Sequence, residues 1–297
     1  MGEQEFETPV PADLIQRLRR KVYNLQMLPA VAMQALELAQ DPDCSIAELT
    51  RIVEQDLKLS TFVLRVANSA LYAGPTAVAS LPQAISWLGL RQCREFILSA
   101  GMDSLSARLT GDLRSRRELL TRHGLLTGLI AARINRQLSL GFEGEEFTAG
   151  LLHDMGRTLL AIAVPERFRS IDPLDFHEAD DIERREHSMI GTSHTNFGEW
   201  FAQWNELPEA LVVAIRHHHS PGRAPAHTRL AALTAVADQI ANHIQRAEPA
   251  DAVDWGTNSA LRLLEESGAA HAVLRVRQAM ETLTVECPNA ADSILAA

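Results

Sequence analysis

Apolar side chains recur along the chain at the three- and four-residue spacing of one helix face, without the alternation of a strand. The spacing is clear at Leu14 and Leu18 near the N-terminus, and at Leu126, Ile130 and Ile134 in the middle of the chain. The pattern predicts an all-α protein, with short helices before about residue 112 and longer helices after it.

Capping residues mark two of the short helices. Ser45-Ile-Ala-Glu48 has the form of a capping box, in which each of the two side chains accepts a hydrogen bond from the other residue's backbone. Ser80-Leu-Pro-Gln83 has the same form, and Gly89 is expected to end the helix that it opens.

Three of the helices predicted in the second half of the chain carry candidate chemistry. One covers residues 145–154 and ends at Gly156, because glycine is common at helix ends. A second is capped by Thr192 and runs to Trp204, and a third covers residues 227–244.

Composition narrows the classes of function. The 297 residues include 28 Lys and Arg against 38 Asp and Glu, a net charge of −10, which argues against bulk nucleic-acid binding through the phosphates. The three cysteines are far apart and form no CxxC pair, so we expect no disulfide framework, no thiolate zinc site and a cytoplasmic location. The longest uncharged stretch, residues 66–90, contains two prolines, and we expect no membrane span and no secretory signal.

Histidines are unevenly distributed. All 11 lie between His123 and His271, so the chemistry of the protein is expected there. His153 and Asp154 are adjacent, and neighbouring helical residues point about 100° apart, so both can reach one ion only near a helix end. Imidazole and carboxylate donors together suit a divalent transition metal, Fe, Mn, Zn or Ni, better than Ca.

Other candidates lie on separate predicted helices. They are His123 on an apolar stripe, His194, the run from His217 to His219, and Asp238 among small residues. Each also has an ordinary structural interpretation. His123 alone is typical of a hydrogen-bonded core residue, the histidine run of a solvated helix end, and Asp238 of a surface residue or cap.

Dispersed motifs accompany these residues. In chain order they are Leu28-Pro-Ala-Val, Glu54-Gln-Asp-Leu-Lys-Leu, Leu64-Arg-Val-Ala-Asn-Ser-Ala-Leu-Tyr, Ala84-Ile-Ser-Trp-Leu-Gly, Gly150-Leu-Leu-His-Asp-Met-Gly-Arg, Glu186 with Gly191-Thr-Ser-His, Trp204-Asn-Glu-Leu-Pro and Ala214-Ile-Arg-His-His-His-Ser-Pro. Together they resemble the HDOD family, a branch of the HD superfamily found in bacterial signal-transduction proteins.

The resemblance implies a domain organisation. It covers about residues 25–240 and implies an all-α HDOD fold, in which an N-terminal helical half (25–110) packs on an HD-like half (111–240). Residues 1–24 would then form an N-terminal helix, and residues 241–297 would form C-terminal helices.

The resemblance also implies a set of metal ligands. The positions that match are His123, His153, Asp154 and Asp238 for one ion, and His194, His218 and His219 as the extra histidines of relatives that hold two or more metals. Arg157 stands where phosphohydrolases of the superfamily carry a cation facing a phosphate, and its alternative interpretation is a solvent-exposed charge at a helix start.

Two functions remain open on this basis. The first is a regulatory module that acts through signalling proteins or self-association, with a metal or a nucleotide as its ligand. The second is a metal-dependent phosphohydrolase acting on a nucleotide or cyclic nucleotide. The glycine-tyrosine-proline signature of cyclic dinucleotide hydrolases is replaced here by Ser220-Pro-Gly. Asp56 and Asn68 in the N-terminal half are interpreted as structural. Both observations favour the regulatory module.

Overall fold

The structure is a computed structural model that describes residues 10–21, 34–35, 38, 44–69, 72, 74, 76–90, 92–93, 96–97, 113–177, 182–249, 252 and 255–296. Within these residues every regular element is a helix, which confirms the all-α prediction. The motif that begins at Leu28 lies outside them. None of the described helices combines the length and the hydropathy that a bilayer span requires.

The N-terminal half contains three described helices that pack on one another. They are α3 (Ile46–Val53), α4 (Leu57–Asn68) and α5 (Leu81–Leu88). Ser45 and Glu48 form the predicted capping box of α3. Ser80 caps α5 through the backbone of Gln83, and Gly89 ends it with a φ of 84°. These predicted helix boundaries are confirmed. They could be predicted from the sequence because they depend only on hydrogen bonds between residues close together in the chain.

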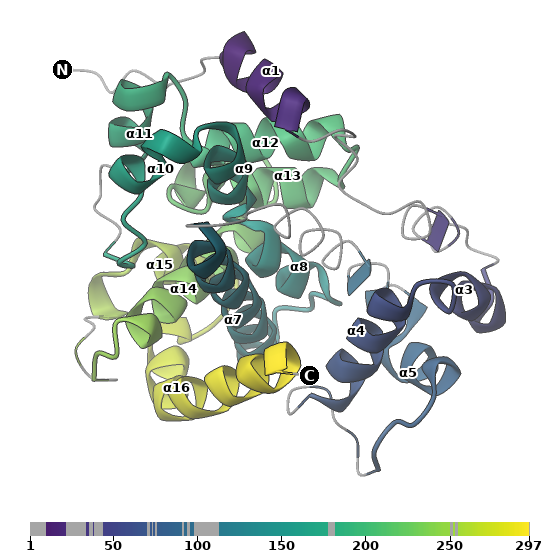
Figure 1. Cartoon of the computed structure of the whole chain (residues 1–297). Coiled ribbons are helices and arrows are strands. Elements are labelled where there is room, and N and C mark those ends of the chain that lie inside the picture. The colour runs from purple at the N-terminus through teal and green to yellow at the C-terminus, as the bar shows by residue number, and fades with distance from the viewer. Residues whose placement is uncertain are drawn as a thin grey trace.

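The second half surrounds a long central helix (Figure 1). Its elements are α7 (Arg114–Leu138), α8 (Glu145–Leu152), α9 (Met155–Ala163), α10 (Pro165–Ile171), α11 (Ile182–Ile190), α12 (His194–Trp204), α13 (Glu209–His217), a 3-10 turn (Pro221–Arg223) and α14 (Thr228–Gln245). The central helix α7 packs on both α8 and α14, and α12 packs on α9 and α13.

The helices near the two ends of the chain pack against this arrangement. Helix α1 (Ala12–Lys21) packs on α9 with Leu14 and Leu18 buried. After a 3-10 turn (Trp255–Thr257) and α15 (Ser259–Glu266), α16 (Ala272–Ala296) lies along α7 and reaches α4 (Figure 1). Arg65 of α4 donates to the carbonyl of Ile294 at 3.1 Å. The last helix therefore connects the two halves, while the boundaries at residues 24, 110 and 240 stay predictions.

Two predicted helix boundaries are wrong. Gly156 lies inside α9, and the chain breaks earlier, at His153 and Asp154 themselves. Gly156 is instead a point of close contact, because a Cβ atom there would lie 1.8 Å from the carbonyl oxygen of His194. The cap of α12 is Ser193, which accepts from the backbone of Asn196 at 3.2 Å, whereas Thr192 is fully buried.

Glycines allow α7 and α8 to approach backbone to backbone. A Cβ atom added at Gly124 would lie 2.6 Å from the carbonyl oxygen of Leu151. One added at Gly128 would lie 2.7 Å from that of Phe147, and one added at Gly150 would lie 2.8 Å from Gly128. This close contact brings the residues just before Gly124 against the residues just after α8.

We expect Gly128→Ala to lower the stability of the protein, because the new methyl group forces α7 and α8 apart. Overpacking of this kind costs about 1–3 kcal/mol. Gly222→Ala is the matched control, since its Cβ atom would meet only Leu263 at 3.8 Å. Thermal unfolding followed by circular dichroism measures the difference, and equal melting temperatures for the two variants would contradict the proposed contact.

Candidate metal centre

All seven side chains predicted from the sequence as metal ligands lie in one cluster inside the second half. Their positions are His123 on α7, His153 and Asp154 between α8 and α9, His194 at the start of α12, His218 and His219 just after α13, and Asp238 on α14. His219 is half-buried and the other six are buried. The interpretation of Asp238 as a surface residue is therefore wrong. The histidine run does lie at the end of α13, but its member His218 is buried rather than solvated.

The first group of ligand atoms consists of the Nε2 atoms of His123 and His153, Oδ2 of Asp154 and Oδ1 of Asp238. Nε2 of His123 lies 3.3 Å from Nε2 of His153 and 3.0 Å from Asp238 Oδ1. Nε2 of His153 lies 3.4 Å from the same Asp238 oxygen, and both imidazoles lie 3.6 Å from Asp154 Oδ2. Ligand atoms about 2.0–2.2 Å from one ion are separated from each other by about 3.0–3.6 Å, as these are.

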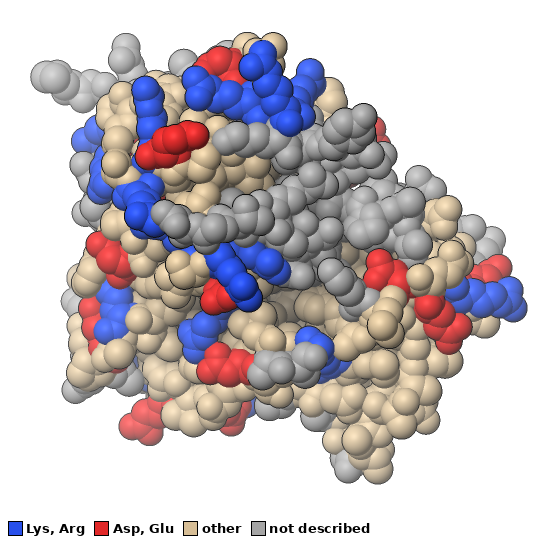
Figure 2. Space-filling view, in the orientation of Figure 1, with Lys and Arg blue, Asp and Glu red and all other residues tan. Residues whose placement is uncertain are grey.

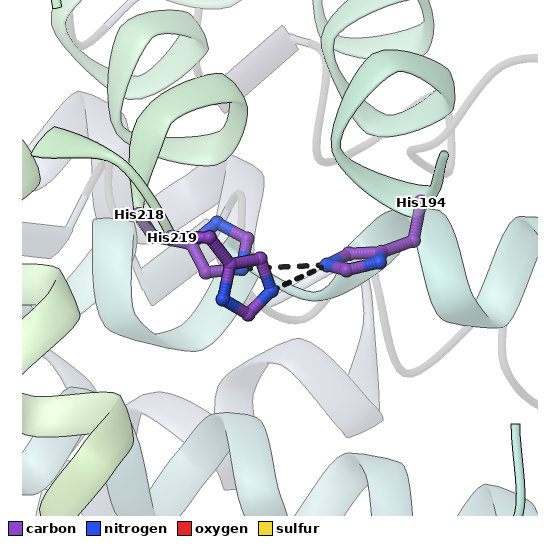
Figure 3. Close-up of side chains that lie close together, drawn as sticks. All are labelled: His194, His218 and His219. Atoms are coloured by element: carbon purple, nitrogen blue, oxygen red, sulfur yellow. Dashed lines mark hydrogen bonds between the residues drawn. The ribbon is translucent and has the colours of Figure 1, made fainter. Parts of the chain in front are cut away.

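The second group consists of three imidazoles and the other oxygen of Asp154. Nε2 of His194 lies 3.5 Å from Nε2 of His218 and 3.0 Å from Nε2 of His219. Figure 3 shows the ring of His194 facing the rings of the other two histidines. Oδ1 of Asp154 is 3.5 Å from His194 and 3.6 Å from His218. This group also has the spacing of atoms that share one ion.

Asp154 joins the two groups through its two oxygens. Its Oδ1 atom is buried and has no hydrogen-bond partner among the described residues. An unpaired buried carboxylate oxygen is costly, and a cation beside it removes that cost. The donor atoms and their spacing therefore fit the binding of transition metal, which the residues of both groups would hold.

Hydrogen bonds at the other ring nitrogen orient the imidazoles. The Nδ1 contacts are His123 with Gln245 Oε1 at 2.5 Å, His153 with the Gly150 carbonyl at 2.6 Å, His194 with Glu186 Oε2 at 2.7 Å and His218 with the Ile215 carbonyl at 2.9 Å. Because each Nδ1 faces an oxygen acceptor, it donates a proton and leaves the Nε2 lone pair free to bind a metal.

Several supporting residues were not identified from the sequence. Asn242 donates to Asp238 Oδ1 at 3.0 Å, and Gln245 accepts from His123. Both lie at helical spacing, four and seven residues after Asp238, so the face of α14 could have indicated them. The third supporting residue is Asp172, which accepts hydrogen bonds from Arg157. It lies in an irregular segment after α10, where no periodic pattern of residues indicates it.

Arg157 is buried, with only 1% of its surface exposed, so its interpretation as a solvated charge is wrong. Its guanidinium donates to both oxygens of Asp172, from Nε at 2.7 Å and from NH2 at 2.8 Å, and from NH1 to Asp154 Oδ2 at 2.7 Å. It thereby holds Asp154 in place. Its role as a phosphate contact stays a prediction.

The carboxylates of the cluster stay ionised. Burial alone would raise the pKa of Asp154, but Arg157 and His153 outweigh it and hold that pKa well below its usual range. Asp238 behaves in the same way, since its hydrogen bonds to His123 and His153 depress its pKa against the effect of burial. Both aspartates therefore present negative charge to the imidazoles.

Two histidines respond to this charge. Burial would lower the pKa of His153, but Asp154 and Asp238 raise it to about 9. Burial is likewise outweighed at His194, where Glu186 and Asp154 raise the pKa to about 10. Burial and neighbouring histidines lower the pKa of His218. Without metal, His153 and His194 are therefore protonated at neutral pH.

Comparison with known proteins identifies the family that this chain resembles. A model of the HDOD domain matches residues 25–221. A curated but uncharacterised protein of Treponema pallidum (strain Nichols) is 25% identical over 216 residues, which cover 69% of this chain and 39% of that protein. The chain thus spans about two fifths of the length of the relative it matches.

Solved structures share the fold. An HDOD domain protein of unknown function from Geobacter sulfurreducens superposes with a TM-score of 0.76 at 25% identity, covering 95% of this chain and 97% of that one. A candidate phosphohydrolase from Shewanella amazonensis superposes with a TM-score of 0.69 at 20% identity, and the match covers 98% of this chain and 100% of that one. A candidate signal transduction protein from Marinobacter aquaeolei superposes with a TM-score of 0.61 at 19% identity, and the match covers 93% of this chain and 65% of that one.

The two raised pKa values predict how stability depends on pH in the chelator-treated protein. A group with a raised pKa contributes stability that is complete below its unfolded value of about 6.5 and is lost as pH rises through its folded value. His153 and His194 titrate at about 9 and about 10, so the melting temperature should fall between about pH 7 and pH 10.

Glu186→Gln provides the control for this measurement. It removes the larger of the two charges that raise the pKa of His194 and does not alter the groups that act on His153, so the alkaline loss of stability should be smaller. Differential scanning fluorimetry over the pH range measures both proteins. A melting temperature that stays level to about pH 10 would contradict the protonated state of these histidines.

Proposed function

The chain belongs to the HDOD family, and on this premise we propose that it is a signal-transduction module whose HD-like half binds divalent transition-metal ions. The observation that carries the proposal is the carboxylate of Asp154, which presents one oxygen to each histidine group and leaves Oδ1 without a hydrogen bond. A shared carboxylate of this kind supports binding of two adjacent ions.

Each ion would have its own ligand set in this proposal. One would be held by His123, His153, Asp154 and Asp238, and the other by Asp154, His194, His218 and His219. Mixed imidazole and carboxylate donors favour Fe, Mn, Zn or Ni. The thiols of Cys44, Cys93 and Cys287 are buried and form no disulfide bond with one another. A cytoplasmic location is part of the proposal.

A signalling role is supported by the described part of the N-terminal half, where the polar residues Asn68 and Asp56 hydrogen-bond to the backbone. Asn68 donates to the carbonyls of Leu64 and Val78, and its Oδ1 accepts from the Val78 backbone at 2.8 Å, so it ties a turn together. Asp56 accepts from the backbone of Leu59 at 3.0 Å, at the start of α4. A half built in this way is suited to packing and protein contact, through signalling partners or a second copy.

A route for communication also exists. Helices α7 and α14 carry ligands of the first ion, and α16 packs on α7 while its last turn contacts α4 through Arg65. Metal binding that changes the packing of α7 would therefore also change the packing of α16 on α4 in the N-terminal half.

The second candidate function is a metal-dependent phosphohydrolase acting on a nucleotide or cyclic nucleotide. It is favoured by the bridging position of Asp154, because two adjacent ions are the arrangement of many phosphate-cleaving enzymes. Metal ions in such a site lower the pKa of bound water and neutralise phosphate charge. The chain's own contribution would be to orient the imidazoles through Gln245 and Glu186.

Metal stoichiometry tests the proposed ligand sets. We expect titration calorimetry with Mn²⁺ or Co²⁺ to show about two ions per chain in the wild type. His123→Ala should lose one ion and His219→Ala the other, whereas Asp154→Asn should weaken both. His177→Ala, at an exposed histidine outside the cluster, is the control and should bind as the wild type does. Unchanged stoichiometry in Asp154→Asn would contradict the shared carboxylate.

A separate assay decides between the two functions. For the signalling module, we expect metal to slow hydrogen exchange in α16 and α4 of the wild type and to leave α4 unaffected in Arg65→Gln, because that variant loses the contact with Ile294. Phosphate release from nucleotides or cyclic nucleotides that disappears in His153→Ala would instead establish the hydrolase. Exchange in α4 that ignores metal would contradict the signalling route.

A further inference from the structure

The segment from Asp172 to Phe176, which follows α10, lies directly over the metal centre. The ring of Phe176 stacks on the imidazole of His123, with centroids 5.4 Å apart and planes inclined by 28°. Phe176 is buried, although the residues on both sides of it are exposed. The ring therefore covers one face of His123, a residue of the first group.

Asp172 occupies the guanidinium of Arg157 at the other end of the segment. Both of its oxygens accept from Arg157, at 2.7 and 2.8 Å, and the side chain is buried. A guanidinium binds a carboxylate and a phosphate through the same forked pair of hydrogen bonds. Asp172 therefore fills the position on Arg157 that a phosphate group would take.

Arginines from the ligand-bearing helices hold both ends of the segment. Arg116 of α7 donates to the carbonyl of Asp172 at 2.6 Å. Arg246, which follows α14, donates to the carbonyl of Phe176 and forms a two-bond fork with Glu248 at 2.8 Å in each bond. The segment is thus fixed to the two helices that supply His123 and Asp238.

The backbone of the segment is held in a disfavoured conformation. Leu174 has a φ of 55° and Phe176 a φ of 58°, both in the left-handed region that side chains with a Cβ atom rarely adopt. The backbone of Leu174 donates to Asp172 Oδ1 at 2.9 Å, so the ion pair also maintains the turn. Breaking the Asp172 contact therefore releases both the turn and its strain.

Positive charge surrounds this segment. Besides Arg157, Asp172 faces Arg116, and Arg169 lies near enough to Arg116 to contribute to lowering its pKa, after the larger effect of burial. Figure 2 shows Lys and Arg side chains around the start of α7 and over α10 and α11 on this face, although the whole chain is acidic. An anion that replaced Asp172 would meet several guanidinium groups.

We propose that residues 172–176 are an internal plug of the metal centre, in which the Asp172 carboxylate stands in for a phosphate on Arg157 and the Phe176 ring covers His123. This inference rests on the proposed function and names its regulation. A phosphate-bearing ligand competes with Asp172 for Arg157, and its binding releases the segment and opens the first metal group.

The ring is tested by the rate at which a chelator removes metal. In Phe176→Ala, we expect EDTA to extract Mn²⁺ at least about tenfold faster than in the wild type, because the cover over His123 is gone. His177→Ala, at the exposed residue that directly follows the segment, should match the wild type. Equal extraction rates in Phe176→Ala and the wild type would overturn the plug.

The carboxylate is tested by anion affinity in proteins with and without metal. Asp172→Asn should bind inorganic phosphate and a nucleoside monophosphate at least about tenfold more tightly than the wild type, since Arg157 regains a free fork. The gain should vanish in Asp172→Asn combined with Arg157→Met. Tighter binding of the nucleotide than of phosphate would identify a nucleotide as the natural source of the group, and equal binding would identify free phosphate.

The results separate this inference from the function on which it rests. A wild type that binds no metal overturns the proposed function, and the phosphate titration of the metal-free proteins still decides the plug. Normal metal binding without the gain in phosphate affinity, or without faster extraction, overturns the plug alone.

Discussion

The buried carboxylate of Asp154 is the constraint on which the arrangement of the second half depends. Each of its oxygens faces a different histidine group, and Arg157 compensates only one of them. A charge in this position is tolerated only if cations or protonated imidazoles converge on it. The helix break at residues 153–154, the close contact of Gly156 with His194 and the glycine contact of α7 with α8 all serve that convergence.

The same centre is connected to the rest of the molecule. Its ligands come from helices that also make the main packing contacts, so α7 carries His123 on one side and supports α16 on another. The irregular segment that starts at Asp172 is attached to these helices by arginines and covers His123. A ligand at the centre, the plug and the N-terminal half are therefore mechanically linked through α7.

Much of this could be predicted from the sequence, and the exceptions share a physical cause. Ser45 and Ser80 were identified as caps because capping depends on residues three positions apart. Gly156 was misinterpreted as a helix end because its requirement for space comes from His194 on another helix. Asp172 and Phe176 left no periodic signal, since their partners Arg157 and His123 are supplied by the tertiary fold.

The most direct test of a metal centre built around Asp154 is elemental analysis of protein purified without chelators and without a metal-affinity step. The account predicts between about one and about two equivalents of Fe, Mn, Zn or Ni per chain. Protein that is folded and contains no stoichiometric transition metal would contradict it, because the orphaned oxygen of Asp154 would then be compensated by protons alone.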